Sequence, residues 1–352
     1  MIKLSSIIKQ YEPLFKGKYN PLPSHKKALN AMKYCRSSVS PQMLVRCSQC
    51  DNHNFIPHSC GHRNCPHCQA HESQQWIEKQ LKAQVPANYF MVTFTLPREL
   101  RDTIWRNQKV MYNMLFECSK ETLQTFAKND KKLGGTTGLM SVLHTHARNL
   151  DYHPHIHVIL PAATLNKHSK TWNAKLGKYL FNHKALAKVF RAKIFAKMTL
   201  LGLKIPATTN QWIVDCKYVG KGEKAIIYLG KYLYRGVILE KNIISNKSGK
   251  ITYRYQNSKT KKYQYKTVTG EHFLYMIMQH VLPKGFRRAR NYGFVHPNCK
   301  KIIALLHYVL KFIPKIVKPK ERPKICCKCC GAEMQIIQTS LNRVVMFAMI
   351  PT

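Results

Sequence analysis

The chain has 352 residues, and its 58 Lys and Arg against 16 Asp and Glu give a formal net charge of +42 at pH 7. Solubility needs a net charge of only about 2 to 8 in a small domain, so this excess indicates a polyanionic partner, with nucleic acid favoured over a membrane surface. No stretch approaches the ~18 uninterrupted apolar residues of a membrane span, and the start lacks a secretory apolar region. We therefore expect a cytoplasmic protein without a membrane partner.

The first part of the chain, up to about Pro86, predicts a small metal-binding domain. The pairs Cys47-x2-Cys50 and Cys65-x2-Cys68 are separated by 14 residues, and such pairs place both thiolates on one tetrahedral ion. Four thiolates leave no position open for catalysis, which predicts one structural Zn²⁺. The exact set of ligands is not fixed by this spacing, because further cysteines and histidines lie in the same region. Any of them could replace a ligand or form a second site. They are Cys60, the alternative ligand, and Cys35, His25, His53, His58, His62 and His67.

From Tyr89 onward the pattern is that of an α+β domain. The segment YFMVTFTL predicts a strand, residues 98–128 fit a helix, and the glycines of LGGTTG end it. GLMSVLHTHA and HPHIHVILP predict neighbouring strands, followed by a helix over 183–200. QWIVDCKYV predicts another strand, and KGEKAIIYLGKYLYRG a helix that ends at Gly236. We therefore expect one central antiparallel sheet with flanking helices.

The motif HPHIH places two histidines on one face of a strand. Side chains alternate along a strand, so His155 and His157 project together while Ile156 points into the apolar layer. Two imidazoles on a rigid strand can hold a divalent ion. An ion that activates a phosphate keeps coordination positions open for phosphate oxygens, and such a site would favour Mg²⁺ or Mn²⁺.

A third ligand is expected from the preceding strand. His144 is the candidate, and His146 is its competitor on the same face. His153 also shares the face of the histidine pair, but we expect Pro154 to end the ladder there.

Two tyrosines in YLGKY lie four residues apart. On a helix, Tyr228 and Tyr232 are therefore one turn apart on a single face, whereas Tyr234 falls on another face. A phenol with a pKa of about 10 is a poor nucleophile at neutral pH, so it needs a metal-activated phosphate or a nearby cation such as Lys231. Attack on a phosphodiester would give a phosphotyrosine and a free hydroxyl, which is strand transfer rather than hydrolysis. The same spacing also suits core tyrosines of an amphipathic helix.

Two basic segments are candidates for binding DNA. ITYRYQ and KKYQYKTV, split by NSKT, predict a hairpin that interleaves tyrosines with Arg254, Lys261 and Lys262, as single-stranded DNA binding requires. The alternative is an edge hairpin made soluble by its lysines. A short helix over 273–281 follows it. The second segment contains the backbone-contact candidates Arg287, Arg288 and Arg290.

The end of the chain contains CCKCC. Here Cys327-x2-Cys330 could complete a metal site with Cys299 or His296, or could belong to a reduced, basic tail. The expected division is a zinc-binding, DNA-contacting domain over 1–86, a catalytic domain over 87–312 and a basic Cys-rich tail over 313–352.

Taken in order, these motifs resemble the two-tyrosine rolling-circle transposases of the insertion-sequence ninety-one type, which have a His-hydrophobic-His (HUH) nuclease domain. The similarity is nearly full length. It runs through SCGHRNCPHC, YFMVTFTLP, LHTHA, HPHIH, the YLGKY helix with a following Arg235, and LPKGFRRARNYG. The tail departs from the pattern, because Lys328 stands where Pro usually separates the Cys pairs.

The resemblance implies a zinc-binding domain followed by an HUH nuclease domain, and the activity of a DNA transposase. Such an enzyme nicks single-stranded element ends through a 5′-phosphotyrosine intermediate and transfers the strand to target DNA by a rolling-circle route. His155 and His157 match the metal pair of the family, and Tyr228 and Tyr232 match its nucleophiles. Lys231 and Arg235 are expected to contact DNA, and the protein to associate with the nucleoid when bound to it.

Two alternatives remain at this point. A rolling-circle replication initiator or relaxase shares the chemistry but acts at a plasmid origin. A non-catalytic, zinc-dependent nucleic-acid-binding protein would need only the charge and the cysteines.

Overall fold

The computed structural model describes residues 1–68, 70–166, 169–233, 236–257, 260–315 and 324–341. The chain divides into two compact units, each built from separate parts of the sequence. Unit 1 comprises residues 1–71, 234–281 and 319–352, and unit 2 comprises residues 72–233 and 282–318. These units cross the boundaries predicted from the sequence, because the basic hairpin and the C-terminal segment group with the N-terminal segment.

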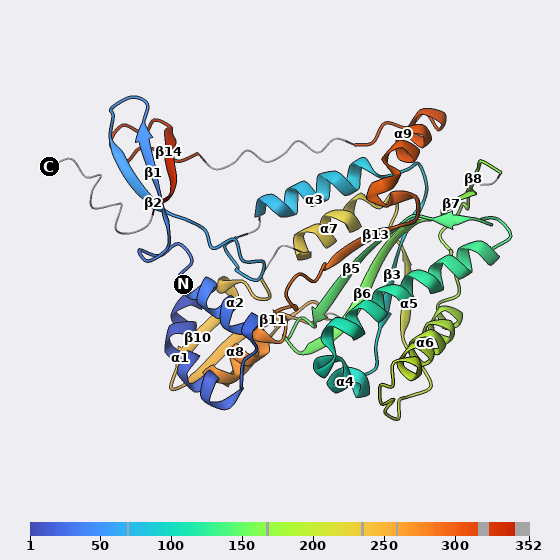
Figure 1. Cartoon of the computed structure of the whole chain (residues 1–352), viewed down its shortest axis with the longest axis horizontal. Helices are drawn as coiled ribbons and strands as arrows, with labels where there is room; N and C mark the ends of the chain where they lie inside the picture. The colour runs from blue at the N-terminus through green and yellow to red at the C-terminus, as the bar shows by residue number, and fades with distance from the viewer. Residues whose placement is uncertain (69, 167–168, 234–235, 258–259, 316–323, 342–352) are drawn as a thin grey trace. The chain divides into compact units, whose positions relative to one another are not determined.

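The centre of unit 2 is a five-stranded antiparallel sheet with strand order β13-β5-β6-β3-β9 (Figure 1). Its strands are β3 (Tyr89–Thr95), β5 (Leu139–His146), β6 (Tyr152–Pro161), β9 (Val214–Tyr218) and β13 (Ala289–Tyr292). The predicted α+β class with a central antiparallel sheet is therefore confirmed. The edge strand β13 was not predicted, since four residues are too few to show a clear alternation.

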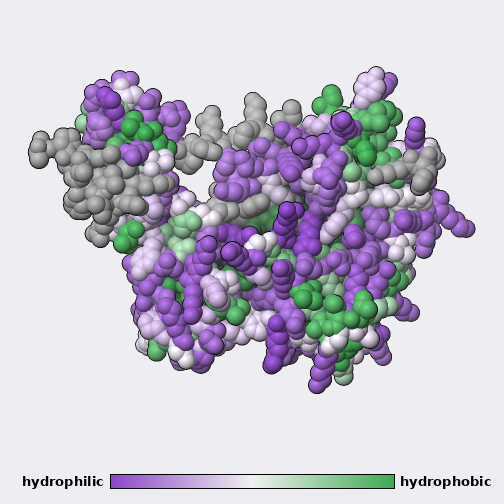
Figure 2. Space-filling model, in the orientation of Figure 1, coloured by the Kyte–Doolittle hydropathy of each residue, from purple (hydrophilic) through white to green (hydrophobic). Residues whose placement is uncertain are grey.

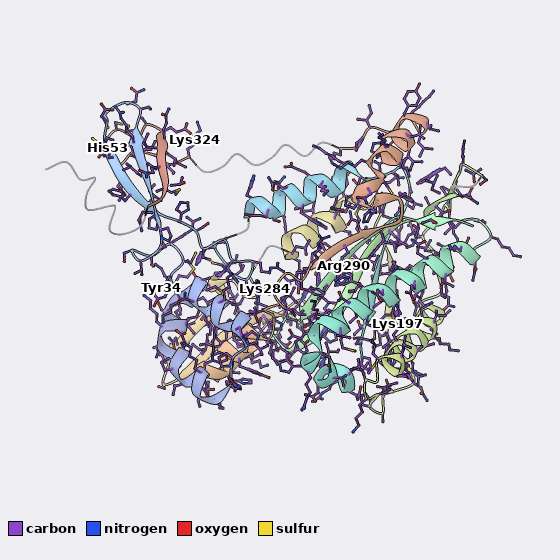
Figure 3. The ribbon with its side chains drawn as sticks, in the orientation of Figure 1. Tyr34, His53, Lys197, Lys284, Arg290 and Lys324 are labelled. Atoms are coloured by element: carbon purple, nitrogen blue, oxygen red, sulfur yellow. The ribbon has the colours of Figure 1, made fainter. Side chains whose placement is uncertain are left out.

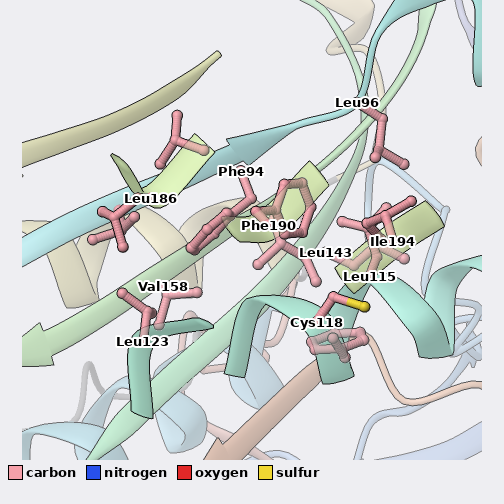
Figure 4. Close-up of a cluster of buried hydrophobic side chains, with 14 of the residues drawn as sticks. Phe94, Leu96, Leu115, Cys118, Leu123, Leu143, Val158, Leu186, Phe190 and Ile194 are labelled. Carbon is pink, nitrogen blue, oxygen red and sulfur yellow. The ribbon is translucent and has the colours of Figure 1, made fainter. Parts of the chain in front are cut away.

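Three helices cover one face of this sheet: α4 (Arg101–Arg106), α5 (Gln108–Asn129) and α6 (His183–Leu200) (Figure 1). The single helix predicted over 98–128 is divided, with a 3-10 turn η1 (Arg98–Leu100) before α4 and a break at Asn107. Phe94, Val158 and Phe190 belong to the core between these helices and the strands (Figure 4). Burial of each such side chain contributes about 1.5–3 kcal/mol, so this face fixes which strand residues point inward.

Helices α3 (Ala70–Lys82) and α7 (Glu223–Leu233) lie on the other face (Figure 1). Gly230 allows them to approach closely, because a Cβ at this position would clash with Ile77 and touch Trp76. The Ser73 hydroxyl donates a hydrogen bond of 2.9 Å to the carbonyl oxygen of Gly230. This contact holds the helix that bears the two tyrosines.

The rest of unit 2 is peripheral to this arrangement. A small sheet with order β4-β7-β8 consists of β4 (Thr136–Thr137), β7 (Ala163–Asn166) and β8 (Thr171–Ala174). The 3-10 turns η3 (Gly293–Val295) and η4 (Pro297–Cys299) lead into helix α9 (Lys300–Val309).

The described residues of unit 1 form two three-stranded antiparallel sheets and three helices. The first sheet, β10-β11-β12, contains the predicted hairpin as β11 (Lys250–Gln256) and β12 (Tyr263–Thr269), and adds the unpredicted β10 (Ile243–Lys247). The helices are α1 (Leu4–Lys18), α2 (Pro23–Lys33) and α8 (Gly270–Met278), the last of which was predicted over 273–281. A 3-10 turn, η2 (Glu240–Asn242), precedes β10.

The second sheet of unit 1, β14-β1-β2, joins the two ends of the chain. It consists of β1 (Gln42–Cys47), β2 (His53–Pro57) and β14 (Met334–Leu341). None of these strands was predicted.

Hydrophilic residues cover most of the face seen in Figure 2, as the excess of lysine and arginine requires. Among the described residues, no helix combines the length and the apolar character that a membrane crossing needs.

The contact at Gly230 can be tested with a matched pair of glycine substitutions. Gly230→Ala should lower the free energy of unfolding by roughly 1–2 kcal/mol, because overpacking costs more than the ~1 kcal/mol that helix propensity returns. Gly17→Ala, in α1, should instead raise it by up to about 1 kcal/mol, since nothing lies within 4 Å of a Cβ there. Urea denaturation of both variants measures the difference, and equal stabilisation would contradict the proposed packing.

Candidate active site and cysteine clusters

Three histidines meet on the face of the unit 2 sheet that lies toward α7. His155 and His157 point from β6, and His144 sits opposite His155 in the register of β5 with β6. Their ring centroids lie 5.1 Å apart for His144 and His155, 4.3 Å for His144 and His157, and 4.9 Å for His155 and His157. One ligand atom from each lies within 4.8 Å of the others. The structure thus brings the predicted pair together with its candidate third ligand.

The neighbouring histidines have other partners. His146, the predicted competitor, interacts through Nδ1 with the hydroxyl of Tyr232 at 2.9 Å and is not part of the group. His153 lies outside it as well, with Nδ1 3.0 Å from the guanidinium of Arg101. The prediction that Pro154 ends the ladder is wrong, because β6 begins at Tyr152 and that residue pairs with His146 across a register shift.

Hydrogen bonds orient the two β6 imidazoles. The Nδ1 atom of His155 donates to the carbonyl oxygen of His153 at 2.7 Å, and Nδ1 of His157 pairs with the Thr93 hydroxyl at 2.9 Å. Bonds of this kind fix the ring and leave Nε2 of His155 as the electron-pair donor. Ile156 between them is fully buried in the opposite core, as the alternation predicted.

The surroundings of the three imidazoles fit a divalent cation. Burial lowers the pKa of His155 to about 3 and of His157 to about 4, and it lowers the pKa of His144 well below its usual range. All three rings are therefore neutral near pH 7, the form that binds metal. The buried Nε2 of His144 finds no hydrogen-bond partner among the described residues. A metal ion would satisfy this atom.

Helix α7 presents both predicted tyrosines to the histidines. The ring of Tyr232 stacks on His144, with centroids 3.3 Å apart and an interplanar angle of 11°. The ring of Tyr228 lies 6.5 Å from that of His144 and the side chain is 50% exposed. Burial raises the pKa of Tyr232. The two phenols thus share one site but differ in access to solvent.

Arg288 completes this site, although the sequence predicted only that it contacts the DNA backbone. Its guanidinium lies 5.2 Å from the centroid of the Tyr232 ring and donates to the carbonyl oxygen of Leu233 at 3.3 Å. Of the predicted cluster of Arg287, Arg288 and Arg290, Arg288 is the residue that lies against the ring of Tyr232. Lys231, the cation predicted to assist the tyrosines, is exposed on α7.

The other predicted basic residues lie in different settings. Arg287 is exposed, but the guanidinium of Arg290 packs 4.2 Å from the ring centroid of Phe116 and donates to Asn113 on α5 (Figure 3). This placement favours a packing role for Arg290 over the predicted DNA contact. Arg235 lies outside the described residues.

The hairpin of unit 1 displays cations and aromatic rings together. Arg254 stacks its guanidinium 4.8 Å from the centroid of Tyr263. Lys261 and Lys262 are exposed at the turn, and Tyr263 and Tyr265 are 56% and 62% exposed on β12. These residues form what we call the hairpin surface.

Eight of the ten cysteines in the described part of unit 1 form two groups of four. The Cys35 cluster contains Cys35, Cys60, Cys65 and Cys68, and the Cys47 cluster contains Cys47, Cys50, Cys327 and Cys330. The predicted set of Cys47, Cys50, Cys65 and Cys68 is therefore corrected, since its two pairs belong to different clusters. The pairing of β1 with β14 brings the C-terminal thiols to Cys47 and Cys50, while Cys60, the predicted alternative, joins Cys65 and Cys68. Neither Cys299 nor His296 belongs to these groups.

Sulfur spacing in the Cys35 cluster fits zinc. The Sγ atoms of Cys35 and Cys68 are 3.6 Å apart, those of Cys35 and Cys65 are 3.6 Å apart, and those of Cys60 and Cys68 are 3.7 Å apart. Tetrahedral zinc with Zn–S bonds of about 2.3 Å separates its sulfurs by about 3.8 Å. Four thiolates would hold the ion without an open position, so it would be structural.

The chain is similar to known proteins in two separate segments and over most of its length. A family model described as "Putative transposase" matches residues 138–302, and one described as "Transposase zinc-binding domain" matches residues 7–96. Over 318 residues the chain is 26% identical to a protein of Sinorhizobium fredii (strain NBRC 101917 / NGR234) described as "Putative transposase y4qJ". That match covers 83% of this chain and 80% of the relative.

A second relative is the transposase for insertion sequence element IS801 of Pseudomonas savastanoi pv. phaseolicola. It is 24% identical over 345 residues, which cover 86% of this chain and 81% of the relative. Among solved structures, conjugative relaxase TrwC in complex with OriT DNA covers 64% of this chain and 73% of its own, with 12% identity. Its TM-score of 0.27 is too low to support a functional argument.

Residues 138–302 of the chain are therefore similar to transposases, and residues 7–96 to a transposase zinc-binding domain. The resemblance to transposases of the insertion-sequence ninety-one type, which the motifs predicted, is confirmed. The zinc-binding description supports structural zinc in the N-terminal segment.

The metal fit of the histidine site can be tested by substitution of His144. His144→Ala should weaken Mn²⁺ binding by about 100-fold, or about 2.8 kcal/mol, because it removes one of three imidazole ligands. Titration calorimetry on zinc-loaded protein measures the effect. His146→Ala is the matched control and should leave the affinity within about twofold, since His146 contacts Tyr232 instead. A larger loss in the control would overturn the choice of ligand.

Proposed function

We propose that the chain is a metal-dependent HUH endonuclease and strand transferase that nicks single-stranded element ends in rolling-circle transposition. The observation that carries this proposal is the meeting of three neutral imidazoles with two tyrosines on one face of the unit 2 sheet. A structural protein would gain little from leaving a buried Nε2 of His144 without a partner.

Nε2 of His144 and the imidazoles of His155 and His157 would hold the ion. When bound, a divalent cation polarises the scissile phosphate and offsets its developing negative charge. Three imidazole ligands leave positions for phosphate oxygens and water. Because magnesium prefers oxygen ligands and keeps several waters, this donor set favours Mn²⁺ over Mg²⁺.

The reaction is a transesterification at phosphorus. The phenolic oxygen of Tyr228 attacks the scissile phosphate, a P–O bond to tyrosine forms, and the P–O3′ bond breaks. The leaving 3′ oxygen takes up a proton as the phenol loses one, so the products are a 5′-phosphotyrosine and a free 3′-hydroxyl. No water is consumed, and the bond energy is kept for joining to target DNA.

The two tyrosines have different starting positions. Tyr228, half exposed, is open to an incoming strand, whereas Tyr232 is held by its stacking on His144 and its bond to His146. We assign the first attack to Tyr228 and the second to Tyr232, which permits two successive cleavages without release of the DNA.

Arg288 supports this chemistry as a fixed positive charge. Its guanidinium lies beside the ring of Tyr232, and its buried Nε has no partner among the described residues. A phosphate oxygen is the complementary acceptor for such a group. Arg288 is therefore proposed to hold the phosphate that is attacked second.

Binding outside the active site is assigned to the hairpin surface. Single-stranded DNA is held by cations on phosphates and by bases stacked on aromatic rings, and Lys261, Lys262, Tyr263 and Tyr265 offer both. This surface belongs to unit 1, and the proposed chemistry to unit 2.

The nucleophile assignment can be tested by substitution of each tyrosine. With Mn²⁺ and a single strand that carries an element end, wild-type protein should form a covalent adduct that survives denaturation. Tyr228→Phe should reduce adduct formation at least about 1,000-fold. Tyr232→Phe should leave the first adduct and abolish strand transfer.

Tyr308→Phe is the matched control, because this tyrosine is 83% exposed on α9, and it should behave as wild type. Adduct formation that persists in both site variants would overturn the nucleophiles. If wild type forms no adduct on any element end, the protein is a non-catalytic binder. Adducts on a plasmid origin but not on element ends would indicate an initiator or relaxase.

Substitution of the hairpin surface should weaken binding without altering the chemistry. Lys261→Gln with Lys262→Gln should reduce the slope of log affinity against log salt by up to about 1.4 for single strands. Loss of Tyr265 should cost about 1–3 kcal/mol if one base stacks on it.

Fluorescence anisotropy with a labelled single strand at several salt concentrations measures both effects. Lys131→Gln with Lys132→Gln removes the same charge from exposed positions of unit 2 and should leave the slope near that of wild type. An equal reduction in this control would indicate that net charge alone sets the affinity.

A further inference from the structure

The Cys47 cluster is not explained by the proposed reaction or by the matched families. Two of its thiols, Cys327 and Cys330, lie outside the matched segments 7–96 and 138–302. Cys330 is 283 positions from Cys47 in the sequence, yet their Sγ atoms are 3.4 Å apart. A contact over this separation needs a specific cause.

The backbone supplies that cause through the sheet β14-β1-β2. Strand β14 pairs with β1, with Cys47 opposite Met334 and Val45 opposite Ile336, while β2 pairs with the other edge of β1. Figure 3 labels His53 and Lys324 near these strands. The buried cluster here is small, consisting of Val45, Cys47, Cys327 and Met334. A sheet with so few buried side chains needs an additional staple.

The two Cys-x2-Cys turns have the same backbone geometry. In residues 47–52 the first N–H donates to the carbonyl oxygen of the sixth residue at 2.8 Å, and in residues 327–332 the equivalent bond is also 2.8 Å. The residue after the second cysteine has a positive φ in both turns, 55° at Asp51 and 77° at Gly331. Two turns from opposite ends of the chain thus repeat one structure.

Backbone amides in both turns point at the first sulfur. The N–H of Gln49 donates to Sγ of Cys47 at 3.4 Å, and the N–H of Cys329 donates to Sγ of Cys327 at 3.4 Å. Such bonds stabilise a thiolate, which is the form that binds metal. Each turn therefore presents a pair of sulfurs in the geometry of half a tetrahedral site.

The sulfur distances distinguish metal binding from disulfides. Besides the 3.4 Å between Cys47 and Cys330, the Sγ atoms of Cys50 and Cys327 are 3.7 Å apart. A disulfide requires about 2.05 Å, whereas two thiolates on one tetrahedral zinc ion lie about 3.8 Å apart. Zinc fits the observed spacing.

We propose that Cys47, Cys50, Cys327 and Cys330 bind a second structural zinc ion, which ties the C-terminal strand β14 to the N-terminal strands β1 and β2. The chain then carries two zinc ions, one in each cysteine cluster. The segment over 324–341 belongs to the metal-binding fold rather than to a dispensable tail, and a truncation that removes it leaves Cys47 and Cys50 with half of their ligands.

The CCKCC motif contains its own control. Cys326 and Cys329 are exposed, and neither belongs to a group of metal-ligating residues in the described part of the chain. Substitution of Cys326 and Cys329 removes two thiols from this motif and spares the proposed ligands. Substitution of Cys327 and Cys330 also removes two thiols, but these are the proposed ligands.

Zinc content of the purified full-length chain, measured by elemental analysis, tests the proposal. Wild type and Cys326→Ser with Cys329→Ser should contain two zinc ions per chain. Cys327→Ser with Cys330→Ser should contain one, and so should Cys35→Ser, which affects only the other cluster. Two ions in the 327 and 330 variant, or a loss in the 326 and 329 variant, would overturn the proposal.

Alkylation of the wild-type chain under non-reducing conditions tests the same proposal without a variant that could fail to fold. It measures which thiols are protected by bound zinc. Mass spectrometry should find Cys326 and Cys329 modified within minutes, and Cys327 and Cys330 protected at least tenfold until a chelator removes the zinc. Equal modification of all four thiols before chelation would contradict the site, as would protection that chelation does not relieve.

Discussion

The register between β5 and β6 is the constraint on which the candidate active site depends. In this register His144 lies opposite His155, Val142 opposite His157 and Leu143 opposite Ile156. A shift of one residue would turn the histidine of β5 into the apolar core and separate the three imidazoles. Leu143 and Ile156 are fully buried on the opposite face, so the hydrophobic core itself holds the histidines together.

The parts of this site that the sequence predicted depend on local periodicity. Strand alternation predicted that His155 and His157 share one face of a strand, and helical spacing predicted that Tyr228 and Tyr232 share one face of a helix. Both predictions were possible because each pattern is complete within a few residues. The choice of His144 over His146 depends on a long-range register, so the sequence left it open. The role of Arg288 depends on the path of residues before β13, which carry no periodic pattern.

The cysteine clusters show what local spacing along the chain does not predict. Their spacing predicted tight turns and a tetrahedral metal, but not which turns meet. Cys47 and Cys50 meet Cys327 and Cys330 because β1 pairs with β14, a strand that lies almost the whole chain away. Spacing along the chain describes a single turn well, whereas the partner of that turn is set by sheet pairing, which no local pattern reveals.

We propose two different roles for metal ions in this protein. In unit 1, zinc bound by four thiolates stabilises the small sheet β14-β1-β2. In unit 2, a divalent ion bound by three imidazoles keeps coordination positions open for phosphate. The most direct test of the central claim is to identify the residue that carries DNA after cleavage of a single-stranded element end with Mn²⁺. Protease digestion and mass spectrometry should find a nucleotide linked through its 5′-phosphate to Tyr228, with Tyr232 linked after the second cleavage. A nucleotide linked to any residue outside α7, or through a 3′-phosphate, would contradict this assignment.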